Sequence, residues 1–139
     1  MKLGIIGCGN MGSALAKGIL SKRVLQFNNI YVSDKDAAKT RALHRKFGII
    51  ISGNEELAKK CNVVIVAVKP KDSDKLLESI SGLLDTRKHL VSIMAGLTIE
   101  RIESHIPKKI AVTRAMPNMA ALAGRSITAL SHNRAVKDK

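Results

Sequence analysis

Three glycines near the start of the chain have the spacing of a phosphate-binding loop. Gly7, Gly9 and Gly12 form the pattern GxGxxG, behind a short apolar run and ahead of a helical pattern. In such a loop the first glycine permits a tight turn, the second lets the backbone approach a pyrophosphate, and the third allows close helix–strand packing. Free amides at the start of Asn10–Ser21, the segment that leads into the next helix, would hold the phosphates. The pattern predicts dinucleotide binding, with a purely structural turn as the alternative.

The next polar cluster follows the second apolar run, as Ser33-Asp34-Lys35. Asp34 comes 22 residues after Gly12, where a dinucleotide-binding fold contacts the adenosine ribose. An acid at this point favours the 2′-hydroxyl of NAD, whereas a basic or hydroxyl side chain favours the 2′-phosphate of NADP. The signals conflict, and the general excess of basic residues favours NADP, with NAD as the alternative. Asp34 or Asp36 has a second interpretation, as the cap of the following helix.

Lys69 follows the fourth apolar run and precedes Pro70, a residue suited to begin a helix. A lysine beside a helix N-terminus meets the positive end of the helix dipole, which makes Lys69 a candidate functional residue. A solvent-exposed lysine is the alternative. Two further segments follow the fifth and sixth runs, and we expect them at the same sheet edge, flanking a nicotinamide. They are Ile93-Met94-Ala95-Gly96-Leu97-Thr98 and Ala115-Met116-Pro117-Asn118.

Strand-like and helical patterns alternate along the chain, and they must position these residues. The strands are expected at residues 2–6, 30–33, 48–51, 63–68, 89–93, 110–114 and 126–130, and the helices at 11–21, 36–47, 54–60, 71–84 and 98–105. Several strands are rich in β-branched residues without strict alternation, which is typical of strands covered on both faces. The pattern predicts an α/β fold: a doubly wound, Rossmann-like, mostly parallel sheet with helices on both faces.

Composition narrows the function classes. The chain has 139 residues and a formal net charge of +13, which favours anionic ligands. Its three aromatic residues and scattered basic residues argue against specific nucleic-acid binding. The chain enters an apparent core strand at once and lacks an apolar run of about 20 residues, so we expect no signal peptide, no membrane span and a cytoplasmic protein. Cys8, Cys61 and the four histidines are too scattered for a metal site, and none is expected.

Several segments together resemble pyrroline-5-carboxylate reductase, the last enzyme of proline synthesis. They are GCGNMGSALAKGIL, VAVKP, SIMAGLTIE and, most specifically, RAMPNMAALAGRSITAL. The resemblance implies NAD(P)H-dependent reduction of 1-pyrroline-5-carboxylate, a small cyclic imine, to L-proline. It implies cofactor contacts at Gly7, Gly9, Asn10, Met11, Gly12, Ser33, Asp34, Lys35, Asn54, Ala67, Val68, Lys69, Pro70, Ala95, Gly96, Pro117 and Asn118. Lys69 is the one candidate for a general acid, and the protonated imine needs little chemical help beyond positioning.

The chain departs from this family in two places. Met119-Ala120 follow Asn118 where the family usually has Thr-Pro, which affects the loop beside the nicotinamide. Family members also continue into a helical domain that forms the dimer, so a full-length form is expected to be a homo-oligomer. We therefore divide the chain into a cofactor domain, residues 1–130, and a connector-like tail, residues 131–139. We expect such a chain to bind dinucleotide and to turn over poorly by itself. A non-catalytic dinucleotide-binding or partner-binding module and another small NADP-dependent reductase are the alternatives.

Overall fold

The computed structural model describes residues 1–107, 109–118, 120 and 125–136. Within them, seven strands form one sheet in the order β3-β2-β1-β4-β5-β6-β7, in which only β7 is antiparallel to its neighbour. The strands are β1 (Leu3–Ile6), β2 (Ile30–Ser33), β3 (Ile50–Ile51), β4 (Val63–Val66), β5 (His89–Ser92), β6 (Ala111–Pro117) and β7 (Thr128–His132). The order 3-2-1-4-5-6 of the parallel strands is that of a Rossmann fold. The predicted doubly wound, mostly parallel sheet is confirmed.

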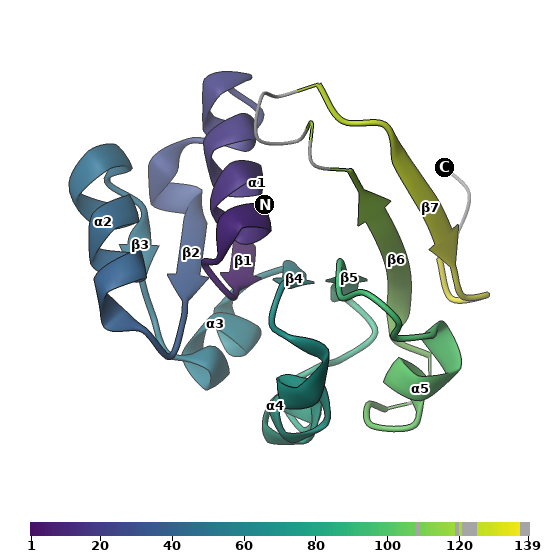
Figure 1. Ribbon diagram of the computed structural model, residues 1–139. Helices are drawn as coiled ribbons and strands as arrows, with labels where there is room; N and C mark the ends of the chain where they lie inside the picture. Colours follow the sequence, from purple (N-terminus) through teal and green to yellow (C-terminus); the bar gives the residue numbers. More distant parts are fainter. Residues whose placement is uncertain (108, 119, 121–124, 137–139) are drawn as a thin grey trace.

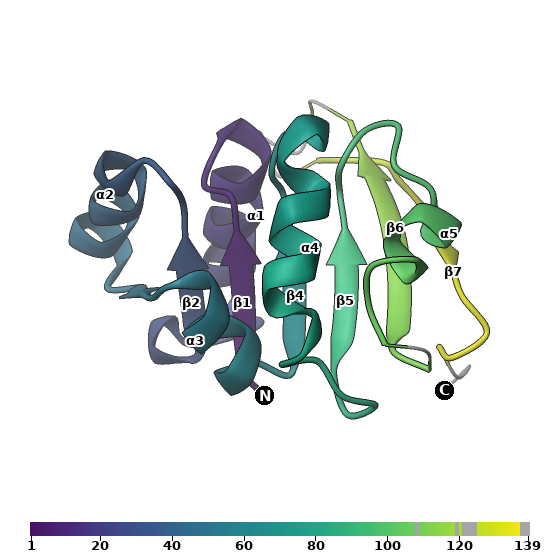
Figure 2. The same ribbon diagram turned by 90° about the horizontal axis from the view of Figure 1, so that it is seen from below.

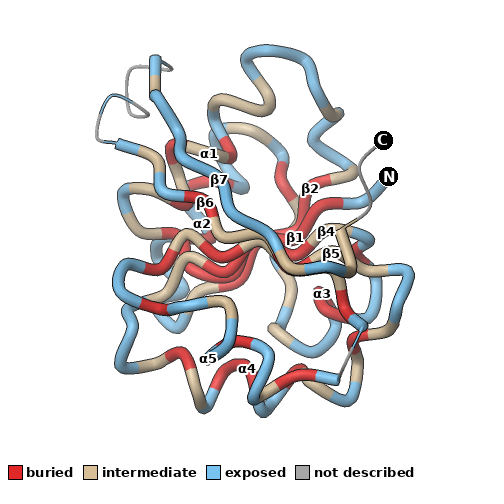
Figure 3. Tube along the Cα trace, turned by 90° about the vertical axis from the view of Figure 1, so that its right-hand side faces the viewer, coloured by how far each residue is buried: buried red, intermediate tan, exposed pale blue. Residues whose placement is uncertain are grey.

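Helices cover both faces of this sheet (Figures 1 and 2). One face carries α1 (Asn10–Ser21) and α2 (Ala37–Phe47), and the other carries α3 (Asn54–Lys60), α4 (Ser73–Ser81) and α5 (Ile99–Glu103). Each layer has its own apolar core, built for example around Ala16 and Leu43 on the first face and around Leu57 and Leu77 on the second. Figure 3 shows the buried residues concentrated along the strands between these layers.

The central strand β1 explains why the glycine loop lies in the middle of the fold. Ile5 is fully buried and lies between Val32 of β2 and Ile65 of β4. Because β4 lies beside β1 and opposite β2, the strand order reverses direction at β1, and the carboxyl ends of β1, β2 and β4 meet at one point. This is the topological switch point, where ligands of open α/β sheets bind.

Most expected elements are present, with a few shifted ends. The expected strand 48–51 contains only two paired residues because Gly48 adopts a left-handed conformation (φ +71°) and ends α2. The expected helix 71–84 begins as a separate 3₁₀ turn, η2 (Pro70–Asp72), and α4 ends at Ser81. β6 extends three residues beyond the expected Arg114 because β7 pairs with it as far as Pro117. Another 3₁₀ turn, η1 (Phe27–Asn29), precedes β2.

Some predictions lie outside the described residues. These include Met119 and the run 121–124 of the most specific family motif, as well as residues 137–139 of the predicted tail. The division into residues 1–130 and 131–139 stays a prediction. Within the described part of the chain, no helix combines the length and apolar character that a membrane span needs.

Candidate functional site: a dinucleotide cavity at the switch point

Two of the three loop glycines are required by the local geometry. Gly7 has φ +102°, and a Cβ atom there would lie 2.5 Å from the carbonyl oxygen of Ala67. A Cβ atom on Gly12 would overlap the carbonyl oxygen of Gly7. Only glycine lets the loop turn this tightly against β4 and lets α1 begin this close to β1.

Gly9 has a different reason to be glycine. It is the N-cap of α1, its φ of −68° suits any residue, and a Cβ atom there would meet nothing within 4 Å among the described residues. No side chain in the described part of the chain caps the amides at the start of α1. The loop therefore leaves an open approach to uncapped amides at the positive end of a helix dipole, which is the environment that a pyrophosphate prefers.

The end of β2 holds this loop in place. The Gly7 amide donates to the carbonyl oxygen of Ser33 at 2.8 Å. The Asp34 carboxylate accepts from the Cys8 amide at 2.6 Å and from the Asp36 amide at 2.8 Å. Of the two aspartates considered as caps of α2, it is Asp36 that does so, accepting from the Ala38 amide at 3.0 Å. The structure therefore gives Asp34 a third role, as the link between the glycine loop and the turn that follows β2.

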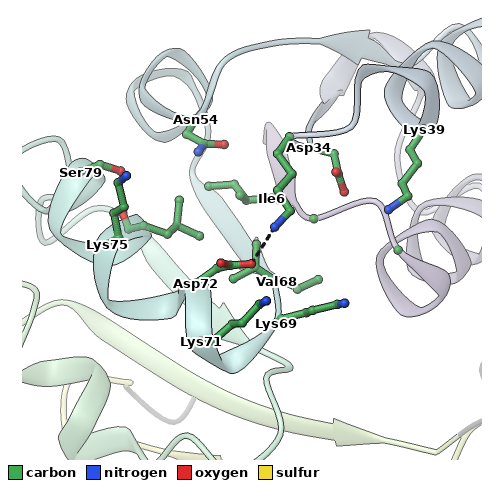
Figure 4. Close-up of a pocket in the computed structure, with 15 residues that line it drawn as sticks. Ile6, Asp34, Lys39, Asn54, Val68, Lys69, Lys71, Asp72, Lys75 and Ser79 are labelled. Carbon is green, nitrogen blue, oxygen red and sulfur yellow. Dashed lines mark hydrogen bonds and ion pairs between the residues drawn. The ribbon is translucent and has the colours of Figure 1, made fainter.

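A cavity of about 410 Å³ opens beside this loop. Its lining comes from the carboxyl ends of β1, β2 and β4 with the glycine loop, the starts of α2 and α3, and one side of η2 and α4 (Figure 4). Five of its lining residues are lysines and two are aspartates, so the cavity attracts anions. The charged lining residues are Asp34, Lys35, Lys39, Lys69, Lys71, Asp72 and Lys75.

The structure brings about half of the predicted site residues into this lining. They are Gly7, Gly9, Asp34, Lys35, Asn54, Ala67, Val68 and Lys69. The first turn of α1, directly after Gly9 in the sequence, contains the predicted residues Asn10, Met11 and Gly12. The predicted residue Pro70 begins η2. Ser33 is buried beneath the cavity, and its hydroxyl donates to the Asn54 amide oxygen at 2.6 Å. Ser33 therefore orients a lining side chain.

The residues predicted to flank a nicotinamide lie at the same sheet edge but do not line this cavity. Ala95 and Gly96 are exposed after β5, and Gly96 has φ +72°. Pro117 ends β6, and the exposed Asn118 accepts from the Ala120 amide at 3.1 Å. Their assignment to the nicotinamide half stays a prediction.

Sequence reasoning missed seven lining residues: Ile6, Lys39, Lys71, Asp72, Lys75, Leu76 and Ser79. Four of them follow Lys71 at helical spacing, since Lys71, Lys75 and Ser79 recur every four residues and Asp72 and Leu76 run beside them. Residues four apart share one helix face. The spacing therefore could have predicted that the helix after β4 turns the side with these residues towards the site.

The two cysteines lie buried on opposite faces of the sheet. Cys8 belongs to the core under α1 and α2, and Cys61 to the core under α3 and α4; both are free. Burial raises the pKa of the Cys8 thiol from 9.0 to about 12, with the nearby Asp34 carboxylate adding to the effect. Burial likewise raises the pKa of Cys61 to about 11. No cluster suited to holding a metal ion forms among the described residues.

These pKa shifts predict a loss of stability in alkali. Above pH 9 the thiols ionise in the unfolded chain but stay protonated in the folded one, so the unfolded state binds fewer protons and stability falls as pH rises. The slope is up to about 1.4 kcal/mol per pH unit for each thiol until the folded-state pKa is reached. Urea unfolding of wild type and of a Cys8→Ala/Cys61→Ala variant at pH 8 to 10.5 measures it. Equal slopes in the two proteins would contradict the assignment.

Fold and site together define a dinucleotide-binding domain of the Rossmann class, because a glycine loop, uncapped helix amides and a cationic cavity coincide at the switch point. The particular family follows from comparison with known proteins. The chain belongs to the family described as NADP oxidoreductase, coenzyme F420-dependent, whose model matches residues 2–96. That description agrees with the cofactor class predicted from the sequence.

Individual relatives extend the similarity over almost the whole chain. The pyrroline-5-carboxylate reductase of Aquifex aeolicus is 38% identical over 134 residues, which are 96% of this chain and 48% of that protein. A pyrroline-5-carboxylate reductase structure from Coxiella burnetii has a TM-score of 0.93 at 27% identity, covering 98% of this chain and 51% of that one. The Plasmodium falciparum pyrroline carboxylate reductase with NADP bound has a TM-score of 0.84 at 32% identity, covering 99% and 50%. The predicted resemblance is confirmed, and this chain spans about half the length of these relatives.

Proposed function

We propose that this chain binds NADP(H) at the switch-point cavity, as the cofactor portion of an enzyme that reduces 1-pyrroline-5-carboxylate to L-proline. The observation that carries the proposal is the pairing of an open, uncapped helix start at Gly9 with a cavity lined by five lysines. A dinucleotide with three phosphate groups matches both features. The residues present therefore fit the group.

The binding mode follows from the geometry of the described residues. The pyrophosphate would approach the amides of Asn10, Met11 and Gly12 across the open side of Gly9. The adenosine ribose would lie near Asp34 and Lys35, with Asn54 beside the adenosine half. Because backbone amides face both Asp34 oxygens, the adjacent lysines carry the charge that a 2′-phosphate would meet. This arrangement supports NADP over NAD.

The reacting half of the cofactor would extend towards Ala67–Pro70 and on to the exposed segments at Ala95-Gly96 and Pro117-Asn118. Bound NADPH supplies a hydride for a carbon–nitrogen double bond. The chain's own contribution is to fix the position of the dinucleotide and to exclude water around it. Lys69 lines the cavity and is exposed, so we propose it as a proton donor to the reduced nitrogen. A cytoplasmic location, a small imine substrate and a homo-oligomeric full-length form complete the proposal.

Titration with NADPH and NADH, followed by nicotinamide fluorescence at low salt, tests the cofactor assignment. Charge-assisted contacts to a 2′-phosphate contribute roughly 1.5–3 kcal/mol, so we expect NADPH to bind about 10- to 150-fold more tightly than NADH. Tighter binding of NADH would assign the ribose to Asp34. Binding of neither would overturn the proposed function.

Proline formation from 1-pyrroline-5-carboxylate and NADPH tests the reaction. We expect a rate far below that of a complete reductase, since this chain spans about half the length of the relatives it matches. If the chain bound NADPH tightly but formed no proline, whether assayed alone or with added segments of a partner protein, the result would favour a non-catalytic dinucleotide-binding module instead. Turnover of other imines or carbonyl compounds in preference would favour a different NADP-dependent reductase.

A further inference from the structure

One ion pair crosses the cavity and joins the two walls of the proposed ribose site. Lys35, in the turn after β2, donates from Nζ to Oδ2 of Asp72 in η2 at 3.1 Å. The two residues are 37 positions apart in the sequence. Figure 4 shows the contact as a dashed line to Asp72, with Asp34 and Lys39 on one side of it and Lys71 on the other.

Asp72 adds a negative charge to a cavity whose five lysines attract anions. The other lining acid, Asp34, has its oxygens directed to backbone amides, whereas the Asp72 carboxylate accepts from the side chain of a lysine. The hydrogen bond from Lys35 lowers the pKa of the Asp72 carboxyl, as do the nearby Lys71 and Lys69, so Asp72 is ionised at neutral pH. A full negative charge therefore lies at the lysine that a 2′-phosphate would need.

We propose that Asp72 is a specificity-determining residue that competes with the 2′-phosphate of the cofactor for Lys35. This inference rests on the proposed function. In the free protein Asp72 occupies the Lys35 ammonium; a 2′-phosphate displaces it, and a cofactor with a 2′-hydroxyl leaves the pair intact. Asp72 thereby weakens binding of the phosphorylated cofactor and narrows the preference for NADP over NAD.

The exposure of the pair makes such an exchange feasible. The side chains of Lys35 and Asp72 are 77% and 38% exposed. Exposed ion pairs contribute little to stability, so their separation costs little. A phosphate carries more charge than a carboxylate and has three acceptor oxygens, so it competes effectively for the ammonium.

The test compares adenosine 2′,5′-bisphosphate with adenosine 5′-monophosphate, two probes that differ only in the 2′-phosphate, by calorimetry at low salt. For Asp72→Asn we expect a roughly three- to tenfold gain in affinity for the bisphosphate and less than a twofold change for the monophosphate. The matched control is Asp85→Asn, which makes the same charge change at an ion pair with Arg87 just before β5, at the opposite sheet edge. We expect less than a twofold change for both probes there.

A second variant separates competition from general repulsion. In a Lys35→Gln background, the gain from Asp72→Asn is expected to shrink; an undiminished gain would overturn competition for Lys35. Equal effects of Asp72→Asn and Asp85→Asn would overturn the role of Asp72, and so would a loss of bisphosphate affinity in Asp72→Asn. All of these outcomes leave the proposed function intact, whereas failure of the wild-type chain to bind NADPH or either adenosine probe would overturn both.

Discussion

Replacement of Gly9 by alanine is expected to weaken NADPH binding about 10- to 150-fold while the melting temperature stays within about 2 °C of wild type. The backbone of Gly9 suits alanine, and the added methyl group would meet no described atom within 4 Å. That empty space is where the pyrophosphate would approach the α1 amides, so the methyl group would separate the phosphates from their hydrogen-bond donors. Fluorescence titration and a thermal melt of the same sample measure both quantities.

Two other glycines make the test selective. Gly12→Ala is expected to lower the free energy of unfolding by about 3 kcal/mol or more, and the melting temperature by roughly 10 °C, because its methyl group would overlap the Gly7 carbonyl. A Cβ atom on Gly82, just after α4, would likewise meet nothing within 4 Å among the described residues, and Gly82 lies outside the cavity lining, so Gly82→Ala should leave NADPH affinity unchanged. If Gly9→Ala bound NADPH as tightly as Gly82→Ala does, the loop would not contact the cofactor.

The parts of this site that the sequence predicts are those encoded by neighbouring residues. The glycine loop is one example, because its three glycines lie within one strand–turn–helix segment, where a Cβ atom on Gly12 would overlap the carbonyl oxygen of Gly7 five residues before it. The placement of Ser33, Asp34 and Lys35 at the sheet edge is another, since a strand's carboxyl end follows from its apolar pattern. The alternation of strands and helices likewise fixes the parallel sheet and its switch point.

The parts that could not be predicted depend on contacts between distant segments. The carboxylate of Asp34 faces an amide 26 residues away, and Lys35 pairs with a residue 37 positions away. Neither distance is encoded in local spacing. The four-residue recurrence of Lys71, Lys75 and Ser79 was visible, but assigning that face to the cavity requires knowing how α4 rotates on the sheet. The buried residues of α4 include Leu77 and Ile80. They show which side of the helix faces the sheet only when the residues of the core are known.

Asp34→Asn is expected to reduce stability by about 1–3 kcal/mol and to weaken NADPH and NADH binding by similar factors. Both partners of the Asp34 carboxylate are N–H donors, the amides of Cys8 and Asp36. Asparagine has one acceptor oxygen and one NH₂ group, so it can satisfy only one of them and must present a donor to the other. The glycine loop would then lose its link to β2, whichever dinucleotide is bound.

The comparison of cofactors decides between this role and direct ribose recognition. If Asp34 chiefly accepted from a ribose 2′-hydroxyl, Asp34→Asn would weaken NADH selectively, and removal of a negative charge would improve NADPH binding. Asp36→Asn provides the matched control, because Asp36 caps α2 through one hydrogen bond from the Ala38 amide. Asparagine caps helices as well as aspartate does, so this variant should retain wild-type stability and affinity. Parallel losses for both cofactors in Asp34→Asn alone would establish Asp34 as the residue that shapes the phosphate loop.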